Sequence, residues 1–109
     1  MPVTFVYITA PNRDEALRIG RTLVEERLAA CVNVFDSMTS VYWWQDAIQQ
    51  DQEAVLIAKT TEPLFERLAQ RVRELHSYEV PCVVALPIMA GSEPYLDWIT
   101  REATPGSPE

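Results

Sequence analysis

The pattern of apolar and polar positions predicts that the chain begins with a strand followed by an amphipathic helix. Residues 3–9 are almost all β-branched or aromatic, which indicates a strand that is covered on both faces. Asn12 followed by Glu15 forms a capping box, in which each side chain binds the other residue's backbone amide at a helix start. Apolar residues then recur at helical spacing as far as about Leu28, so we expect the helix to end there.

The rest of the pattern predicts a long hairpin, a second helix, a closing strand and a terminal helix. Strand-like runs at 30–35 and 40–44 are separated by a break at residues 36–38, and another strand is expected over 53–59 after a turn at residues 45–47. Thr61 caps a helix that ends near Leu75. The chain re-enters the sheet over 82–88, and Ser92 caps a last helix to about Ala103.

This order of elements predicts an α+β fold of one domain. We expect a ferredoxin-like βαββαβ sandwich with a long β-hairpin and a C-terminal helix, in which two helices cover one face of an antiparallel sheet. Residues 1–103 would form the domain, and the Pro-, Gly- and Ser-containing residues 104–109 would form a flexible tail.

The strands are too apolar for a sheet with one face in water, which predicts a homo-oligomer. Residues 55–58 and 83–88 carry no charge, although helices are available for only one face. Tyr42, Trp43 and Trp44 add a cluster of large side chains near the hairpin tip, and neighbouring strand residues point to opposite faces. We expect these three residues and Trp98 in the contact between copies. In the alternative, the terminal helix covers them.

Composition narrows the function and the compartment. The chain has 109 residues, a net charge of −7 and 48% hydrophobic residues. An acidic protein repels phosphate backbones and anionic membrane surfaces, so neither nucleic acid nor a membrane is an expected partner. Cys31 and Cys82 form no CxxC motif, and the N-terminus carries no signal-peptide pattern. A reducing cytoplasm is therefore the expected location.

A collinear set of motifs resembles the CutA divalent-cation tolerance family. The motifs are ERLAACVN at 26–33, SVYWW at 40–44, KTT at 59–61, HSYEVP at 76–81 and YLDWI at 95–99. The resemblance implies a ferredoxin-like fold, a homotrimer similar in architecture to PII signalling proteins, and a cytosolic role linked to divalent metals, copper especially. It brings no reaction with it, and the chain has no recognisable catalytic motif, so we expect a protein that is not an enzyme.

The resemblance transfers only part of the family's copper site. Its first-strand Cys and one of its two His positions are occupied here by Ile8 and Leu75, which leaves His76. We expect His76 to bind a divalent cation with help from Glu79 or Cys82 of the same turn. A set of His76, Cys31 and Cys82 is a second arrangement. In the alternative, His76 only interacts with the C-terminal end of its helix.

A polar pocket at the subunit interface is the second candidate site. Lys59 is the only lysine of the chain, and it is expected to line this pocket with Tyr42, Trp44, Glu53 and Tyr78. The pocket favours an alternative function, a PII-like signalling or scaffold trimer that binds a small molecule or a partner protein between subunits. Lys59 could equally form a salt bridge with a carboxylate across the interface.

Overall fold

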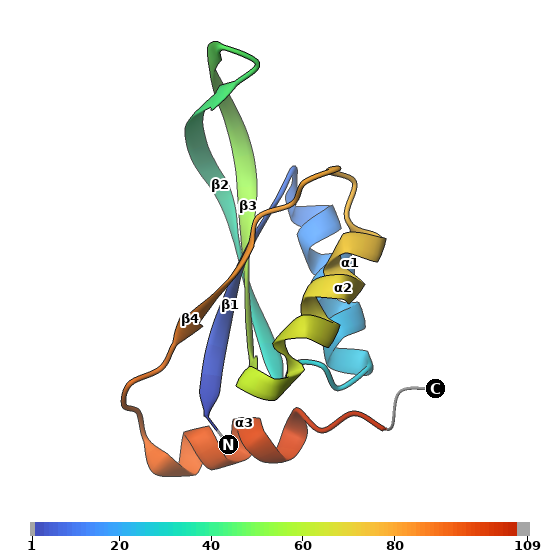
Figure 1. Cartoon of the computed structure of the whole chain (residues 1–109), viewed down its shortest axis with the longest axis vertical. Helices are drawn as coiled ribbons and strands as arrows, with labels where there is room; N and C mark the ends of the chain where they lie inside the picture. Colours follow the sequence, from blue (N-terminus) through green and yellow to red (C-terminus); the bar gives the residue numbers. More distant parts are fainter. Residues whose placement is uncertain (1, 107–109) are drawn as a thin grey trace.

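The computed structural model describes residues 2–106 and is organised around a four-stranded antiparallel sheet (Figure 1). Its strands lie in the order β2-β3-β1-β4. The outer strands are therefore β2 (Cys31–Trp44) and β4 (Val83–Pro87), and the inner ones are β3 (Ala47–Thr61) and β1 (Val3–Ala10). This is the predicted α+β, ferredoxin-like fold.

Two helices cover one face of this sheet, as predicted, and enclose the core. They are α1 (Arg13–Glu25) and α2 (Phe65–Leu75), the latter entered through a 3₁₀ turn (Glu62–Leu64). Alternate residues of the inner strands point toward them and are fully buried. The sheet residues of this core are Val6, Ile8, Ala10, Ala54, Leu56 and Ala58. These are every second residue because successive side chains of a strand point to opposite faces of the sheet.

Helix α1 differs from the prediction in two ways: only half of the capping box forms at its start, and it ends earlier than expected. The Asn12 side chain accepts a hydrogen bond from the Glu15 amide at 2.8 Å, which confirms half of the box. The other half is wrong, because the Glu15 carboxylate accepts hydrogen bonds from the Ser77 amide and hydroxyl instead. The helix ends before Leu28 because Arg27 adopts a φ of 60° and reverses the chain.

The expected side-chain caps of the other helix starts are also wrong. Neither Thr61, before the 3₁₀ turn, nor Ser92 makes a side-chain capping bond. Pro63 and Pro94 stand in these first turns, where a missing N–H removes one of the free donors that a cap would otherwise satisfy.

The hairpin is longer and more continuous than its sequence suggested. The expected break at residues 36–38 is a bulge inside β2, where the register with β3 shifts between Phe35 and Met38 and Ser37 has a φ of 62°. β3 begins at Ala47 rather than at residue 53. Gln45 and Asp46 both have positive φ, as a two-residue turn matched to the strand twist requires. The hairpin therefore projects beyond the rest of the domain (Figure 1).

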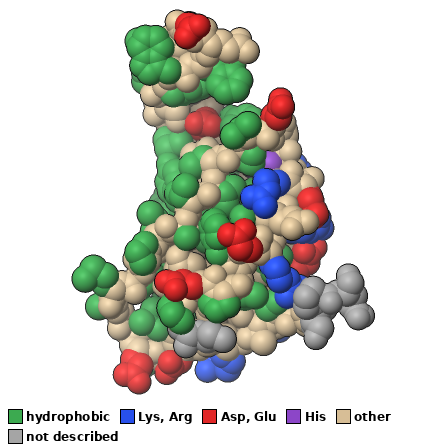
Figure 2. All heavy atoms as spheres, viewed as in Figure 1, with side chains coloured by type: hydrophobic (Ala, Val, Ile, Leu, Met, Phe, Trp, Pro, Cys, Tyr) green, Lys and Arg blue, Asp and Glu red, His purple; other side chains and the backbone are tan. Residues whose placement is uncertain are grey.

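The terminal helix lies at the opposite end of the molecule from the hairpin tip. Helix α3 (Glu93–Glu102) crosses below the sheet in Figure 1 and buries Ile99 against β1 and β3. The alternative that this helix covers the aromatic tip is therefore wrong. Trp43 is 72% exposed and Trp44 is 56% exposed, and Figure 2 shows apolar side chains gathered at the tip.

Candidate functional site

The face of the sheet that α1 and α2 leave open is largely apolar and carries the candidate residues. Strand pairing places Cys31, Lys59 and Phe5 in one row across this face, with Leu86 beside Phe5. Phe35, Val84 and Leu86 are about half exposed there. Apolar exposure of this extent on a sheet face is typical of a protein–protein contact.

The polar groups at the base of the hairpin form what we call the hairpin-base cluster: Tyr42, Asp51, Glu53, Tyr78 and Cys82. The Tyr78 hydroxyl donates a hydrogen bond to Glu53 at 2.9 Å, and the Tyr42 hydroxyl donates one to Asp51. Burial and the hydrogen bond to Glu53 raise the pKa of Tyr78. Burial, followed by the charge of Glu53, raises the pKa of the Cys82 thiol.

Burial is the largest cause of both pKa shifts, and the negative charge of Glu53 adds to each of them. Within the described residues 2–106, no Lys, Arg or His nitrogen lies within ion-pair distance of Asp51 or Glu53. A second negative charge on a phenolate or a thiolate nearby is therefore disfavoured. The cluster is an anionic site without a positive partner among the residues that the structure describes.

His76 has both ring nitrogens engaged. Its side chain is fully buried, with Nε2 2.7 Å from the Thr9 carbonyl oxygen, while Nδ1 accepts the Tyr78 amide at 3.0 Å. Nδ1 also lies 3.4 Å from a Glu15 carboxylate oxygen. The ring therefore fixes the turn after α2 and sets the position of Tyr78, whose ring centroid is 4.8 Å away.

The structure does not bring the predicted metal ligands together. Glu79 and Cys82 are exposed, whereas His76 faces inward. In the part of the chain that the structure describes, no three His, Cys, Asp or Glu side chains are grouped to hold a metal ion. Cys31 lies beside Lys59, away from the turn that holds His76 and Cys82, so the arrangement with two cysteines is not formed within one chain.

Lys59 occupies a separate place on the open face. Its Nζ donates a hydrogen bond to the Tyr95 hydroxyl at 2.9 Å and lies 5.3 Å from the ring centroids of Phe5 and Tyr95. The Cys31 thiol is 3.8 Å from the same hydroxyl. The hydrogen bond to Tyr95 is the main reason that the pKa of Lys59 is raised.

The predicted interface pocket is divided within a single chain. Tyr42, Glu53 and Tyr78 meet in the hairpin-base cluster, whereas Lys59 is six residues farther along β3, a distance of about 20 Å at 3.3 Å per residue. Trp44 lies at the hairpin tip. Sequence reasoning missed Asp51, although its spacing of two from Glu53 places both on one face. It also missed Tyr95 as a partner of Lys59, which no local pattern indicated.

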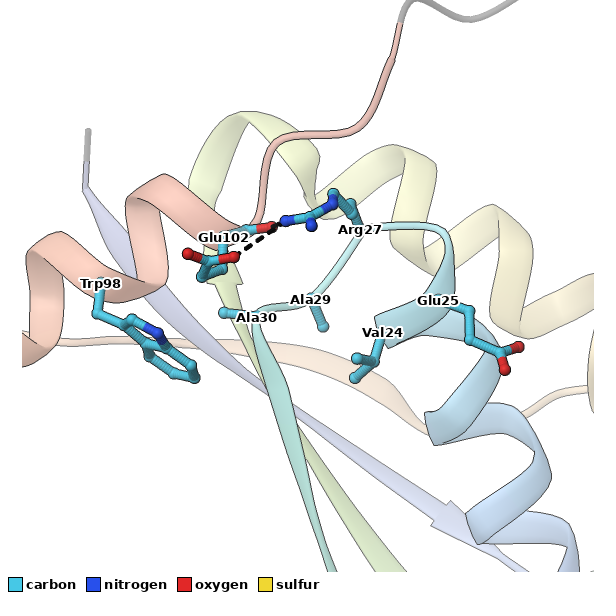
Figure 3. Close-up of a pocket in the computed structure, with 7 residues that line it drawn as sticks. All are labelled: Val24, Glu25, Arg27, Ala29, Ala30, Trp98 and Glu102. Carbon is cyan, nitrogen blue, oxygen red and sulfur yellow. Dashed lines mark hydrogen bonds and ion pairs between the residues drawn. The ribbon is translucent and has the colours of Figure 1, made fainter.

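A hollow of about 490 Å³ lies between the end of α1, the start of β2 and α3 (Figure 3). Trp98 stands on one side of it and Val24 on the other, and an ion pair of Arg27 with Glu102 at 3.0 Å spans its rim. Trp98 also stacks on Tyr95, with ring centroids 5.7 Å apart. Trp98 lines the hollow and contacts Tyr95, and Tyr95 in turn binds Lys59, so α3 contacts both places.

Comparisons with known proteins agree with this fold. Residues 4–102 match the family described as "CutA1 divalent ion tolerance protein". The chain is 52% identical over 99 residues to "Divalent-cation tolerance protein CutA" of Thermus thermophilus, covering 91% of this chain and 95% of that protein. A solved structure of the divalent cation tolerance protein (Cut A1) from Thermus thermophilus has a TM-score of 0.90 at 48% identity, and the alignment covers 92% of this chain and 97% of that one.

A plant relative shows that the domain also occurs in longer proteins. "Protein CutA 1, chloroplastic" of Oryza sativa is 43% identical over 106 residues, which cover 94% of this chain but 60% of the plant protein. No helix among the described residues is long and apolar enough to cross a membrane. The match over residues 4–102 and the identity to curated relatives make this chain a member of the CutA1 divalent ion tolerance family.

Proposed function

We propose that this chain works in the cytoplasm as a homotrimer that binds divalent cations such as copper, and that it contributes to tolerance of these metals without being an enzyme. The observation that carries the proposal is the family match over residues 4–102, together with names of relatives that state divalent-cation tolerance. The charge of −7 favours cations over anions as ligands.

The open face supports the assembly part of the proposal. Phe35, Val84 and Leu86 on the sheet, and Trp44 near the hairpin tip, are between 47% and 56% exposed in one chain, and strand pairing places all four on the open face. Burying such side chains contributes roughly 1.5–3 kcal/mol each. A second and a third copy would cover this surface, since α1 and α2 occupy the other face and α3 packs at the far end from the hairpin.

The geometry of His76 changes which residues we propose as ligands. Binding a metal through His76 would break its hydrogen bond to Thr9 or to the Tyr78 amide, and each buried group left unpaired costs about 1–3 kcal/mol. The residues Cys82 and Glu79 are exposed, so a cation reaches them without breaking such hydrogen bonds, although it must displace the proton of the Cys82 thiol, whose pKa is raised. We therefore propose that Cys82 and Glu79 reach the cation first, with neighbouring copies supplying further ligands.

Calorimetric titration with Zn²⁺ tests this proposal, because Zn²⁺ accepts thiolate and carboxylate ligands and does not oxidise thiols. We expect Cys82→Ser and Glu79→Gln each to weaken binding about tenfold. Cys31→Ser is the matched control, since Cys31 lies beside Lys59, and it should bind like the unaltered chain.

Three results would count against parts of the proposal. Equal affinity of the unaltered chain, Cys82→Ser and Glu79→Gln would contradict these ligands. Binding lost only in His76→Ala, with the fold intact, would return the assignment to His76. A light-scattering mass of one chain would contradict the homotrimer.

A second candidate function is a PII-like signalling or scaffold trimer that binds a small molecule or a partner protein. The hollow beside Trp98 is open to solvent, and it offers such a ligand an aromatic wall and an ion pair. Thermal-shift screening of nucleotides and carboxylates tests this function. A stabilising compound should lose its effect in Trp98→Ala, and a screen without any stabilising compound would contradict it.

A further inference from the structure

The open face of one chain carries two half-sites of opposite charge that its own fold keeps apart. One half-site is Lys59, and the other is the pair of Asp51 and Glu53 in the hairpin-base cluster. All three residues sit at odd-numbered positions of β3 and therefore point to the same face of the sheet. Six residues of extended strand, about 20 Å, separate Lys59 from Glu53.

Each half-site lacks its ionic partner. Among residues 2–106, no carboxylate oxygen lies within ion-pair distance of Lys59, although other pairs such as Arg71 with Glu26 and Arg27 with Glu102 are formed. Lys59 is half-buried between two aromatic rings, a position in which a charge is less well solvated than at an ordinary surface. The ammonium group donates one hydrogen bond, to the Tyr95 hydroxyl, and its charge is left without a carboxylate among these residues.

The carboxylates of Asp51 and Glu53 are held in place by hydrogen bonds, but no cationic side chain among residues 2–106 pairs with them. Tyr78 and Tyr42 each give one hydrogen bond and thereby orient Glu53 and Asp51, but a hydroxyl leaves the negative charge in place. Burial is the main cause of the raised pKa of Tyr78 and of Cys82, and the charge of Glu53 raises both further. Residues 31–61 contain four acidic residues, and their only basic residue is Lys59.

We propose that Lys59 of one copy forms an ion pair with Glu53 and Asp51 of the next copy, so that the hairpin-base cluster is completed only between subunits. The partner is a second copy of this chain because both half-sites lie on the same apolar face and are complementary to each other. The inference rests on the proposed homo-oligomer and adds the register in which the copies meet. The base of one hairpin lies over the Lys59 end of the neighbouring sheet.

The single lysine of the chain allows a direct test. A carbodiimide condenses a carboxylate with an amine to an amide, with loss of water, so the only reactive amines are Lys59 and the chain's amino terminus. We expect a cross-linked product with the mass of more than one chain, in which mass spectrometry finds Lys59 joined to Glu53 or Asp51. Lys59→Arg keeps the positive charge but removes the primary amine, and it should abolish this cross-link.

A double-mutant cycle gives an independent readout. Sites farther apart than about 10 Å that share no partner usually act additively, so we expect no sizeable coupling between Lys59 and Glu53 within one chain. We expect Lys59→Met and Glu53→Gln each to weaken assembly about tenfold, and the double variant to be no weaker than the weaker single variant. The exposed α1 pair Arg21 and Glu25 supplies matched controls, Arg21→Met and Glu25→Gln, which should leave assembly unchanged.

The outcomes separate this inference from the proposed function. A light-scattering mass of one chain would overturn both. An oligomer in which Lys59 is not cross-linked to Glu53 or Asp51, or in which the two substitutions act additively, would overturn the ion pair and leave the homo-oligomer standing. A coupled cycle with the expected cross-link would support both.

Discussion

The Nε2 atom of His76 lies 2.7 Å from the carbonyl oxygen of Thr9, which joins the end of α2 to the end of β1. The other ring nitrogen accepts the amide of Tyr78, so the turn after α2 is fixed from both sides of one ring. Tyr78 is thereby placed to donate its hydroxyl to Glu53 on the hairpin. A residue predicted as a metal ligand thus organises the surroundings of the hairpin-base cluster.

His76→Ala is expected to lower the free energy of unfolding by about 2–4 kcal/mol. The substitution leaves a buried carbonyl and an amide unpaired and opens a cavity in place of the ring. Urea denaturation followed by far-ultraviolet circular dichroism measures the loss. His76→Gln should recover part of it, because the Gln side chain can again donate to the Thr9 carbonyl oxygen. Unchanged stability of His76→Ala would contradict the structural role.

The raised pKa of Tyr78 predicts that the folded chain loses stability at alkaline pH. Its pKa is raised in the folded chain by burial and by Glu53, so the folded state holds the phenolic proton after the unfolded state has released it. The unfolded state then binds fewer protons, and stability falls as pH rises above about 10, the ordinary pKa of tyrosine. Thermal unfolding between pH 8 and 11 should fall more steeply for the unaltered chain than for Tyr78→Phe. Parallel curves would contradict this coupling.

The sequence was sufficient for the layers of the fold but not for the details of its elements. The run of β-branched and aromatic residues over 3–9 and the helical spacing over 65–75 are local signals, and the structure has a strand and a helix there. The sequence predicts a break at Ser37 because a bulge interrupts alternation in the same way as a loop does. It predicts a side-chain cap at Ser92, but Pro94 in the first turn of the helix reduces the need for one.

In the candidate site, too, contacts that depend on the folding of the whole chain could not be predicted from local sequence patterns. Tyr42, Glu53 and Tyr78 lie together in one chain, whereas Lys59 is six residues farther along β3, and sequence distance alone does not reveal this separation. The partners of His76 are a backbone carbonyl and a backbone amide. Every residue type offers these groups, so no sequence pattern points to them.

Glu53→Gln is expected to increase the alkylation rate of Cys82. Burial raises the pKa of this thiol first, and the negative charge of Glu53 raises it further, so removing that charge increases the thiolate fraction. Iodoacetamide at pH 8, with each cysteine followed by peptide mass spectrometry, should show Cys82 reacting about two- to threefold faster. Cys31 in the same sample is the internal control. An unchanged Cys82 rate would show that Glu53 does not act on the thiol.

Gly20→Ala is expected to destabilise the chain by about 1 kcal/mol. A Cβ atom at Gly20 would lie 2.9 Å from side-chain carbons of Leu56 and Val32, so α1 would have to move away from the sheet. Alanine favours a helix over glycine by about 0.5–1 kcal/mol, whereas overpacking a core costs about 1–3 kcal/mol. The packing cost should therefore exceed the gain in helix propensity, as urea denaturation would measure. A variant more stable than the unaltered chain would show that α1 is not held this closely.

Trp44→Ala is expected to shift the light-scattering mass toward that of a single chain. Trp44 is 56% exposed in one chain, so its truncation removes little that stabilises the isolated fold. In an assembly the same side chain would be covered, and truncating a central aromatic contact typically costs about 2 kcal/mol or more of association free energy. Leu17→Ala on the outer side of α1 is the control, because Leu17 is similarly apolar and 38% exposed but lies on the helix layer. A Trp44→Ala chain with unchanged mass and unchanged dissociation on dilution would remove the hairpin tip from the subunit contact.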